Sequence, residues 1–143
     1  KEDALISVTG NAAQTVIAST SSDGSNAVKM NAVWTIGPES HFTADTTGRV
    51  VYTGIKTTPE PIDFSVTLAM ASGGAQQVSA YIALNGTPIT STGQQLTVSS
   101  SSVASVVVIW QHSFATGDYV ELFLEGVSST VNIIGQRSVG RIN

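Results

Sequence analysis

The feature that most constrains the fold of this chain is the regular alternation of apolar and polar residues in several short segments. In PIDFSVTLAM, residues 61–70, every second side chain from Ile62 to Met70 is apolar, and residues 28–36 and 78–84 alternate in the same way. Because side chains of a β-strand point to opposite faces in turn, a period of two predicts strands with one buried face. Many short strands separated by turns predict an all-β sandwich of two antiparallel sheets, with little or no helix.

The dipeptide Asn85-Gly86 is a strong signal for a tight turn between two of these strands. Both central residues of a type I′ turn have positive φ, which asparagine and glycine tolerate, so we expect a β-hairpin here. Together with Thr87, the same residues match the acceptor sequence for N-glycosylation. The hairpin explains the sequence without a glycan, and we favour the turn.

The balance of charges excludes one large class of function. The 143 residues include six lysines and arginines, ten aspartates and glutamates, and no cysteine. Nucleic-acid binding needs clustered basic side chains, and a disulfide framework or thiolate metal site needs cysteine. Charged residues make up 11% of the chain, against about 25% in ordinary domains. A surface of hydroxyls and small side chains favours an extracellular or virion protein over a cytosolic enzyme.

Groups that could perform catalysis are sparse. His41 and His112 are far apart in the chain and lie in no recognisable nucleophile motif. Glu121 and Glu125 share one strand face, but four residues of strand separate them by about 13 Å, more than the ~9.5 Å that paired glycosidase carboxylates span. The segment SSDGSN lacks the repeated acidic ligands of a calcium loop and predicts a turn. We therefore predict a non-enzymatic protein that needs no metal or other cofactor.

Two segments are apolar on both faces, and a sandwich with one inner face per sheet does not explain the second face. The first is VASVVVIWQH, residues 103–112, and the second is DYVELFLEG, residues 118–126. In each, we expect one face in the core and the other against neighbouring copies of the chain. The alternative is that a loop or the N-terminal segment of the same chain covers it. The residues that we assign to the intersubunit face are Val106, Val108, Trp110, Tyr119, Glu121 and Phe123.

Residues 1–20 are the least clearly patterned part of the chain. Leu5, Val8 and Ala12 have the spacing of a coiled-coil seam, while Gly10 and several β-branched residues also permit a strand or a linker. We expect a stalk junction or linker over residues 1–20 and one domain over residues 21–143.

Arg137 and Arg141 lie on one face of the last expected strand. Guanidinium groups bind carboxylate or phosphate through charge-assisted hydrogen bonds. One interpretation is a cleft between subunits that holds a small anion. The other, which we favour, is an ordinary salt bridge to Glu121 or Glu125.

The order of the segments resembles that of the trimeric jelly-roll head shared by tumour necrosis factor, the complement-type globular heads and many fibre or spike tips of bacteriophages. The resemblance runs from GRVVYTG, residues 48–54, to VNIIGQRSVGRIN, residues 131–143. Its most characteristic element is Gly117-Asp118 before a Val/Leu-rich strand. The cysteine-free chain, rich in serine and threonine, is most similar to phage tips, and among them to the distal knob of the tail needle of short-tailed phages.

This resemblance implies a homotrimeric jelly roll at the tip of a virion, exposed to the extracellular medium. Such a knob closes the portal channel, joins other tail or portal proteins through an N-terminal stalk, and contacts the host outer membrane, including glycan or lipopolysaccharide, during genome ejection. The alternative is a carbohydrate-binding module of a tail fibre or spike, because jelly rolls occur in lectins. Trp34 and Trp110 lie on apolar faces, which weakens an interpretation that needs exposed rings, while Tyr52 and Tyr81 leave it open.

Overall fold

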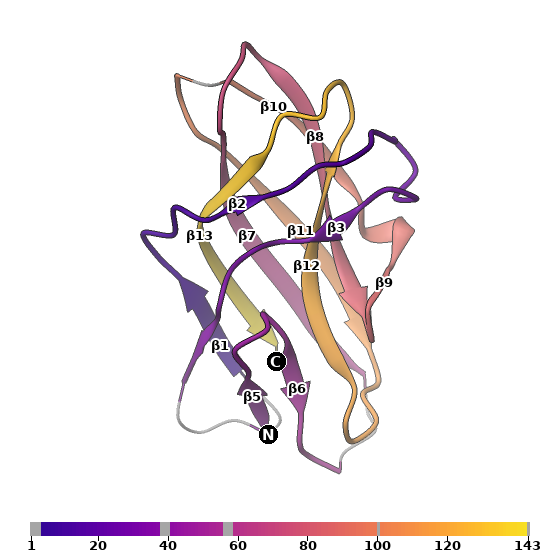
Figure 1. Cartoon of the computed structure of the whole chain (residues 1–143). Helices are drawn as coiled ribbons and strands as arrows, with labels where there is room; N and C mark the ends of the chain where they lie inside the picture. Colours follow the sequence, from indigo (N-terminus) through magenta and orange to yellow (C-terminus); the bar gives the residue numbers. More distant parts are fainter. Residues whose placement is uncertain (1–3, 38–40, 56–58, 100, 143) are drawn as a thin grey trace.

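The computed structural model describes residues 4–37, 41–55, 59–99 and 101–142. The strands of this part form two antiparallel sheets, one of six strands and one of seven (Figure 1). Its one helical element is a single 3-10 turn, η1. The elements in chain order are β1 (Ala4–Val8), β2 (Gln14–Thr15), β3 (Val28–Lys29), β4 (Thr35–Ile36), β5 (Phe42–Ala44), β6 (Val50–Tyr52), β7 (Glu60–Met70), β8 (Gln76–Leu84), β9 (Thr87–Pro88), η1 (Thr90–Thr92), β10 (Gln94–Val98), β11 (Ala104–His112), β12 (Tyr119–Gly126) and β13 (Ile133–Ile142). The all-β prediction is confirmed.

The six-stranded sheet has the order β11-β7-β13-β1-β4, with β2 beside β13. Alternate residues of β7 from Ile62 to Met70 are at most 5% exposed and form one wall of the core, as the alternation predicted. The long strands β7 and β13 are paired from Ile62 with Ile142 to Met70 with Ile133. They form the rigid centre of this sheet.

The seven-stranded sheet has the order β10-β8-β12-β6-β5, with β3 beside β12 and β9 beside β8. Its inner face is built from alternate residues of β8 and β12, and each of these side chains is at most 1% exposed. They are Val78, Ala80, Ile82, Val120, Leu122 and Leu124. Packing of the two inner faces against each other makes one continuous hydrophobic core.

The turn between β8 and β9 has the expected backbone conformation. Asn85 has a φ of 52° and Gly86 a φ of 84°, which fits the two left-handed positions of a type I′ turn. Ala83 and Leu84 of β8 then pair with Pro88 and Thr87 of β9. The hairpin prediction is confirmed.

Residues 28–36 do not form one strand, although they alternate. β3 pairs with β12 in the seven-stranded sheet, whereas β4 pairs with β1 in the six-stranded sheet. Between them, Met30, Ala32 and Trp34 are at most 8% exposed. The segment therefore crosses from one sheet to the other with its apolar side chains turned into the core, and the alternation reflects this burial rather than a ladder.

The N-terminal segment differs from the stalk junction expected over residues 1–20. β1 pairs with β13 over five residues, from Ala4 with Ile142 to Val8 with Ser138, and β2 also pairs with β13. Ile6 is fully buried in the core. The described chain is therefore part of the sandwich from Ala4 onward, because β13 needs a partner on this side and Ile6 completes the core beneath it.

Candidate functional site

The outward side chains of the six-stranded sheet form a surface that we name the open face. Four apolar side chains on it are strongly exposed: Leu5 at 55%, Val107 at 54%, Ile109 at 66% and Val139 at 44%. They lie on β1, β11 and β13, so the exposed apolar surface spans several neighbouring strands. An isolated exposed leucine or valine is ordinary, but a group on one sheet face indicates a contact surface.

The register of the strands places charged and hydroxyl side chains among these apolar ones. Asp63 of β7 is opposite Ile109 on one side and Arg141 on the other, and Arg141 is opposite Leu5. Directly opposite residues on a sheet have their side chains on the same face, about 5 Å apart. The open face therefore combines apolar patches with one carboxylate and one guanidinium group in the same rung.

The structure corrects the predicted orientation of β11. Val106, Val108 and Trp110 are opposite Val66, Phe64 and Ile62, the inward residues of β7. Accordingly Val108 is fully buried, and Val106 and Trp110 are half-buried against the core. The exposed face is the other one, with Val107 and Ile109. The sequence does show that Val107 and Ile109 form a second apolar face of this strand. Alternation alone, however, does not say which of the two faces is turned toward the core.

The two glutamates on the outer face of β12 are buried by the protein's own chain, whereas Tyr119 and Phe123 on the same face are half-buried. Phe123 and Leu124 pair with Lys29 and Val28 of β3. Glu121 is 4% exposed, and its carboxylate lies 3.6 Å from the Lys29 ammonium group. Burial raises the pKa of Glu121, and Lys29 opposes this rise. The covering segment is thus the loop and strand before Met30, which was the alternative to another subunit.

Because β11 and β12 belong to different sheets, the predicted intersubunit set does not form one surface. Tyr119, the third member of the set on β12, is half-buried and lies beneath the guanidinium group of Arg49, 4.7 Å from the ring centroid. Arg49 also donates a 2.6 Å hydrogen bond to Asp45. Although burial acts to raise the pKa of Asp45, hydrogen bonds from Thr47 and Arg49 hold it well below its usual value.

Glu125 is fully buried on the outer side of the seven-stranded sheet and is held by three donors. Its carboxylate accepts 2.7 Å hydrogen bonds from the Gly24 amide and the Tyr81 hydroxyl, together with a hydrogen bond from the Ser21 hydroxyl. Burial, and then the adjacent Glu125 carboxylate, raise the pKa of Tyr81 to about 12. Glu125 thereby fastens the loop that begins at Ser21 to the sheet.

Arg137 and Arg141 do share the outer face of β13, as expected, and both are exposed. Their predicted salt bridge to Glu121 or Glu125 is wrong, because these carboxylates lie on the other sheet with the partners named above. The anion-binding alternative stays a prediction.

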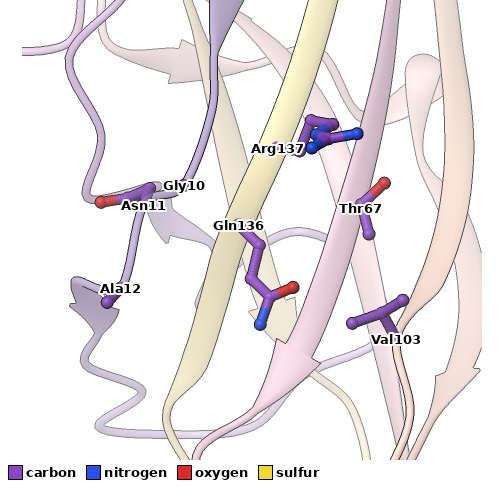
Figure 2. Close-up of a pocket in the computed structure, with 7 residues that line it drawn as sticks. All are labelled: Gly10, Asn11, Ala12, Thr67, Val103, Gln136 and Arg137. Atoms are coloured by element: carbon purple, nitrogen blue, oxygen red, sulfur yellow. The ribbon is translucent and has the colours of Figure 1, made fainter.

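A hollow of about 490 Å³ lies beside Arg137. Figure 2 shows Gln136 and Arg137 on β13, Thr67 on β7, Val103 just before β11, and the loop Gly10–Ala12 at the other side. The pairing of β13 with β7 shifts between Gly135 and Arg137, which is a β-bulge. A bulge leaves one residue without a partner and changes the direction of its side chain, so Gln136 and Arg137 both line the hollow although they are consecutive.

His112 lies beside Trp110 and Asp118. The His112 ring is stacked on Trp110, with centroids 4.7 Å apart, and its Nε2 lies 3.5 Å from Asp118 Oδ2. Asp118 also accepts hydrogen bonds from Asn85 and the Ala115 amide. Although burial acts to raise the pKa of Asp118, these donors lower it. The Gly117-Asp118 element therefore joins the loop before β12 to the β8–β9 turn.

Within residues 4–37, 41–55, 59–99 and 101–142, no group of three or more histidine and carboxylate side chains is arranged to hold a metal ion. Among the same residues, no helix has the length and apolar character needed to cross a membrane.

The strand order of the two sheets and the similarity to a solved structure show that the fold is a jelly roll of the tumour necrosis factor type. The crystal structure of murine APRIL at pH 5.0 matches with a TM-score of 0.60 and 11% identity, over 100% of this chain and 99% of that chain. Murine APRIL at pH 8.0 matches with a TM-score of 0.58 and 10% identity, over 99% of both chains. The globular domain of zebrafish complement 1qA matches less well, with a TM-score of 0.48, 13% identity, and coverage of 99% of this chain and 91% of that chain.

No family model matches the sequence, and no curated protein matches it either. The similarity to APRIL, at this level of identity, shows the fold and not the function.

Proposed function

We propose that this chain forms a homotrimeric, non-enzymatic head at the tip of a phage tail needle or fibre, where it contacts the host cell envelope during genome ejection. The observation that supports this most is the open face of the six-stranded sheet. Leu5, Val107, Ile109 and Val139 are all 44–66% exposed there, on strands of a jelly roll of the tumour necrosis factor type.

Two further copies of the same chain are the occupants that best suit the open face. Soluble monomers rarely expose a contiguous apolar patch of more than a few hundred Å². Closed rotational symmetry hides such a patch by using one surface in every subunit. The face also contains Asp63 and Arg141, and groups of opposite charge on one surface allow each copy to complement the next. The resemblance to trimeric heads selects three copies.

The positions of the chain ends suit a head on a stem. Ala4 and Ile142 are register partners on β1 and β13, so both ends of the described chain lie at one end of the sandwich (Figure 1). The turn between β7 and β8, residues 71–75, lies at the opposite end. A stem that enters at the N-terminus would leave this opposite end free to meet a host surface. The hydroxyl-rich, cysteine-free sequence supports a virion setting.

Sedimentation at micromolar concentration tests the trimer. Val107→Asp places a charge on the open face and should disperse the trimer to monomers, because the carboxylate would be buried without a partner. Val33→Asp is the matched control, since Val33 is also 54% exposed but lies between β3 and β4. The control should stay trimeric. A wild-type monomer would overturn the trimer, and a trimeric Val107→Asp protein would overturn the use of this face.

Binding of the trimer to outer-membrane vesicles that contain lipopolysaccharide tests the host contact. The proposed head should sediment with such vesicles. If the protein binds vesicles from none of several Gram-negative hosts, the proposed host contact is wrong. The proposed trimer would not be affected by that result. The alternative function is a carbohydrate-binding module of a fibre or spike. It is supported by a hollow on the outer side of the seven-stranded sheet, whose lining includes the hydroxyl side chains of Ser22, Ser79 and Thr90. A glycan array separates this function from a purely structural tip.

A further inference from the structure

A second hollow lies on the outer side of the seven-stranded sheet, away from the open face. Its volume is about 370 Å³, within the range of about 300–1,000 Å³ that small-molecule sites occupy. Three separate parts of the chain surround it: the loop before β3, the strand β8, and the stretch from η1 into β10. The lining residues are Ser22, Asp23, Ser79, Tyr81, Thr90, Gly93 and Gln95.

The floor of this hollow is rigid. Ser79 and Tyr81 of β8 are only 3% and 4% exposed, and the Tyr81 hydroxyl donates to the buried Glu125 carboxylate. Glu125 also binds the Gly24 amide, which fixes the loop that forms one wall. Fixed side chains lose little entropy when a ligand binds, so the floor is preorganised.

Two glycines let the backbone approach the Tyr81 ring closely. A Cβ atom on Gly93 would lie 2.5 Å from Cε1 of Tyr81, so no side chain fits there. Gly24, which packs against Thr90 and Tyr81, has a φ of +86°, a conformation that other residues rarely adopt. The backbone at Gly93 and Gly24 therefore packs closely around Tyr81, which holds the ring in place at the floor of the hollow.

The polar groups around the hollow are hydroxyls, one carboxamide and one carboxylate, and no basic side chain lines it. Asp23 and Gln95 are exposed at its rim. Hydrogen bonds from Ser25 lower the pKa of Asp23, so it is a carboxylate at neutral pH and a strong acceptor. Such a lining repels anions and offers both donors and acceptors to a ligand with several hydroxyl groups.

We propose that this hollow binds one neutral, hydroxyl-rich saccharide unit. Asp23 and Gln95 bind adjacent ligand hydroxyls at the rim, and the hydroxyls of Ser22 and Thr90 complete the contacts. The site lies on the sheet opposite to the open face, so it stays accessible in the trimer. The inference rests on the proposed function in one respect, namely that the saccharide belongs to the host surface. It adds the chemical class of the ligand that the protein binds there.

Amide chemical shifts of the isotope-labelled wild-type protein, followed by NMR, test the proposal. The probes are D-glucose, D-galactose, L-rhamnose and N-acetyl-D-glucosamine, with D-glucuronate as the anionic comparison. At least one neutral probe should give saturable shifts at the Gly24, Ser79 and Gly93 amides, with a dissociation constant of about 1–30 mM. Glucuronate should bind at least about tenfold more weakly than that probe. Absence of saturable shifts with all four neutral probes, or equal binding of glucuronate, would overturn the proposal.

Variants on one strand locate the contact. Gln95→Ala should weaken binding of the responding probe about fivefold to tenfold, the effect of one lost hydrogen bond. Gln94→Ala is the matched control, because Gln94 is the preceding exposed glutamine of β10 and its side chain points to the other face. Asp23→Ala should weaken binding by at least as much as Gln95→Ala. Equal effects of Gln94→Ala and Gln95→Ala would place the ligand elsewhere and overturn the site.

Failure of this inference can be told apart from failure of the proposed function. If the protein is monomeric and the shifts still saturate at Gly24 and Gly93, the saccharide site holds and the trimeric head fails. If the trimer binds vesicles and Gln95→Ala leaves that binding and the probe shifts unchanged, the head holds and this site fails.

Discussion

The hydroxyl of Tyr81 donates a 2.7 Å hydrogen bond to the fully buried carboxylate of Glu125. Tyr81 is opposite Phe123, and Glu125 is opposite Ser79, so the two residues are diagonal neighbours on the same face of β8 and β12. Within the described part of the chain, the carboxylate accepts hydrogen bonds from the hydroxyls of Tyr81 and Ser21 and from the amide of Gly24, and none of these donors is basic. Three neutral donors thus hold the buried carboxyl group of Glu125 in place.

Tyr81→Phe should lower the free energy of unfolding by about 1–3 kcal/mol, because it removes a hydrogen-bond donor from a fully buried polar group. Urea denaturation followed by circular dichroism measures this. Tyr119→Phe is the control, since Tyr119 is half-buried and its ring lies beneath Arg49, and it should cost less than about 1 kcal/mol. If the two variants lose the same amount of free energy of unfolding, the hydrogen bond from Tyr81 to Glu125 does not stabilise the fold.

Ionisation of Tyr81 should destabilise the fold at alkaline pH. Its pKa is raised from 10.0 to about 12, first by burial and then by Glu125. A group whose pKa is raised in the folded state contributes stability that is complete below its unfolded pKa and is lost as the pH rises toward the folded value. Stability should therefore fall between about pH 10 and pH 12. The Tyr81→Phe protein should show a smaller fall in the same range, and an identical fall would contradict the assignment.

Gly140→Ala should lower the free energy of unfolding by about 1–3 kcal/mol through overpacking. A Cβ atom at Gly140 would lie 2.5 Å from two carbons of the Phe64 ring and 2.8 Å from Ile6. Gly74→Ala is the control, because a Cβ atom there meets nothing within 4 Å. Thermal denaturation compares the two variants. If Gly140→Ala leaves the free energy of unfolding unchanged, then β1 and β7 separate more easily than their packing indicates.

Asp118→Asn should cost about 1–3 kcal/mol near neutral pH, because the charged acceptor of Asn85 and Ala115 is lost. The pKa of Asp118 is lowered in the folded state, so its contribution is present above the ordinary aspartate pKa of 3.8 and is lost as the pH falls further. The difference in stability between wild type and variant should therefore shrink on acidification. Urea denaturation over a series of acidic pH values measures it, and a constant difference would contradict this role.

The long central strands could be predicted from the sequence because their alternation reports directly on burial. For β7, every second residue from Ile62 to Met70 faces the core as expected. For β11, both residue sets are apolar, so the pattern identifies two faces without saying which is inward. The register with β7 decides it, since Phe64 is opposite Val108 and is fully buried. Register is a long-range property that a local pattern does not contain.

Other features depend on pairings between distant parts of the chain. β1 has only five residues, and its partner β13 lies at the other end of the sequence, so its short pattern resembled a coiled-coil spacing. Glu121 was predicted to lie on the intersubunit face, yet Lys29 contacts it, and Ser21 and Gly24 bind the neighbouring Glu125. The hollow beside Tyr81 lies where the loop before β3 and the stretch from η1 into β10 come together on β8, and no spacing in the sequence indicates that arrangement.

Because Ala4 pairs with Ile142, the chain is suited to circular permutation. Because the two ends are neighbours, a short linker could join them, and the exposed glycine-containing turn at residues 72–74 offers a place to open the chain again. The new ends would then lie at the opposite end of the sandwich (Figure 1). A circularly permuted chain fused to a rod would present to the outside the end of the sandwich that the proposed function places next to the stem.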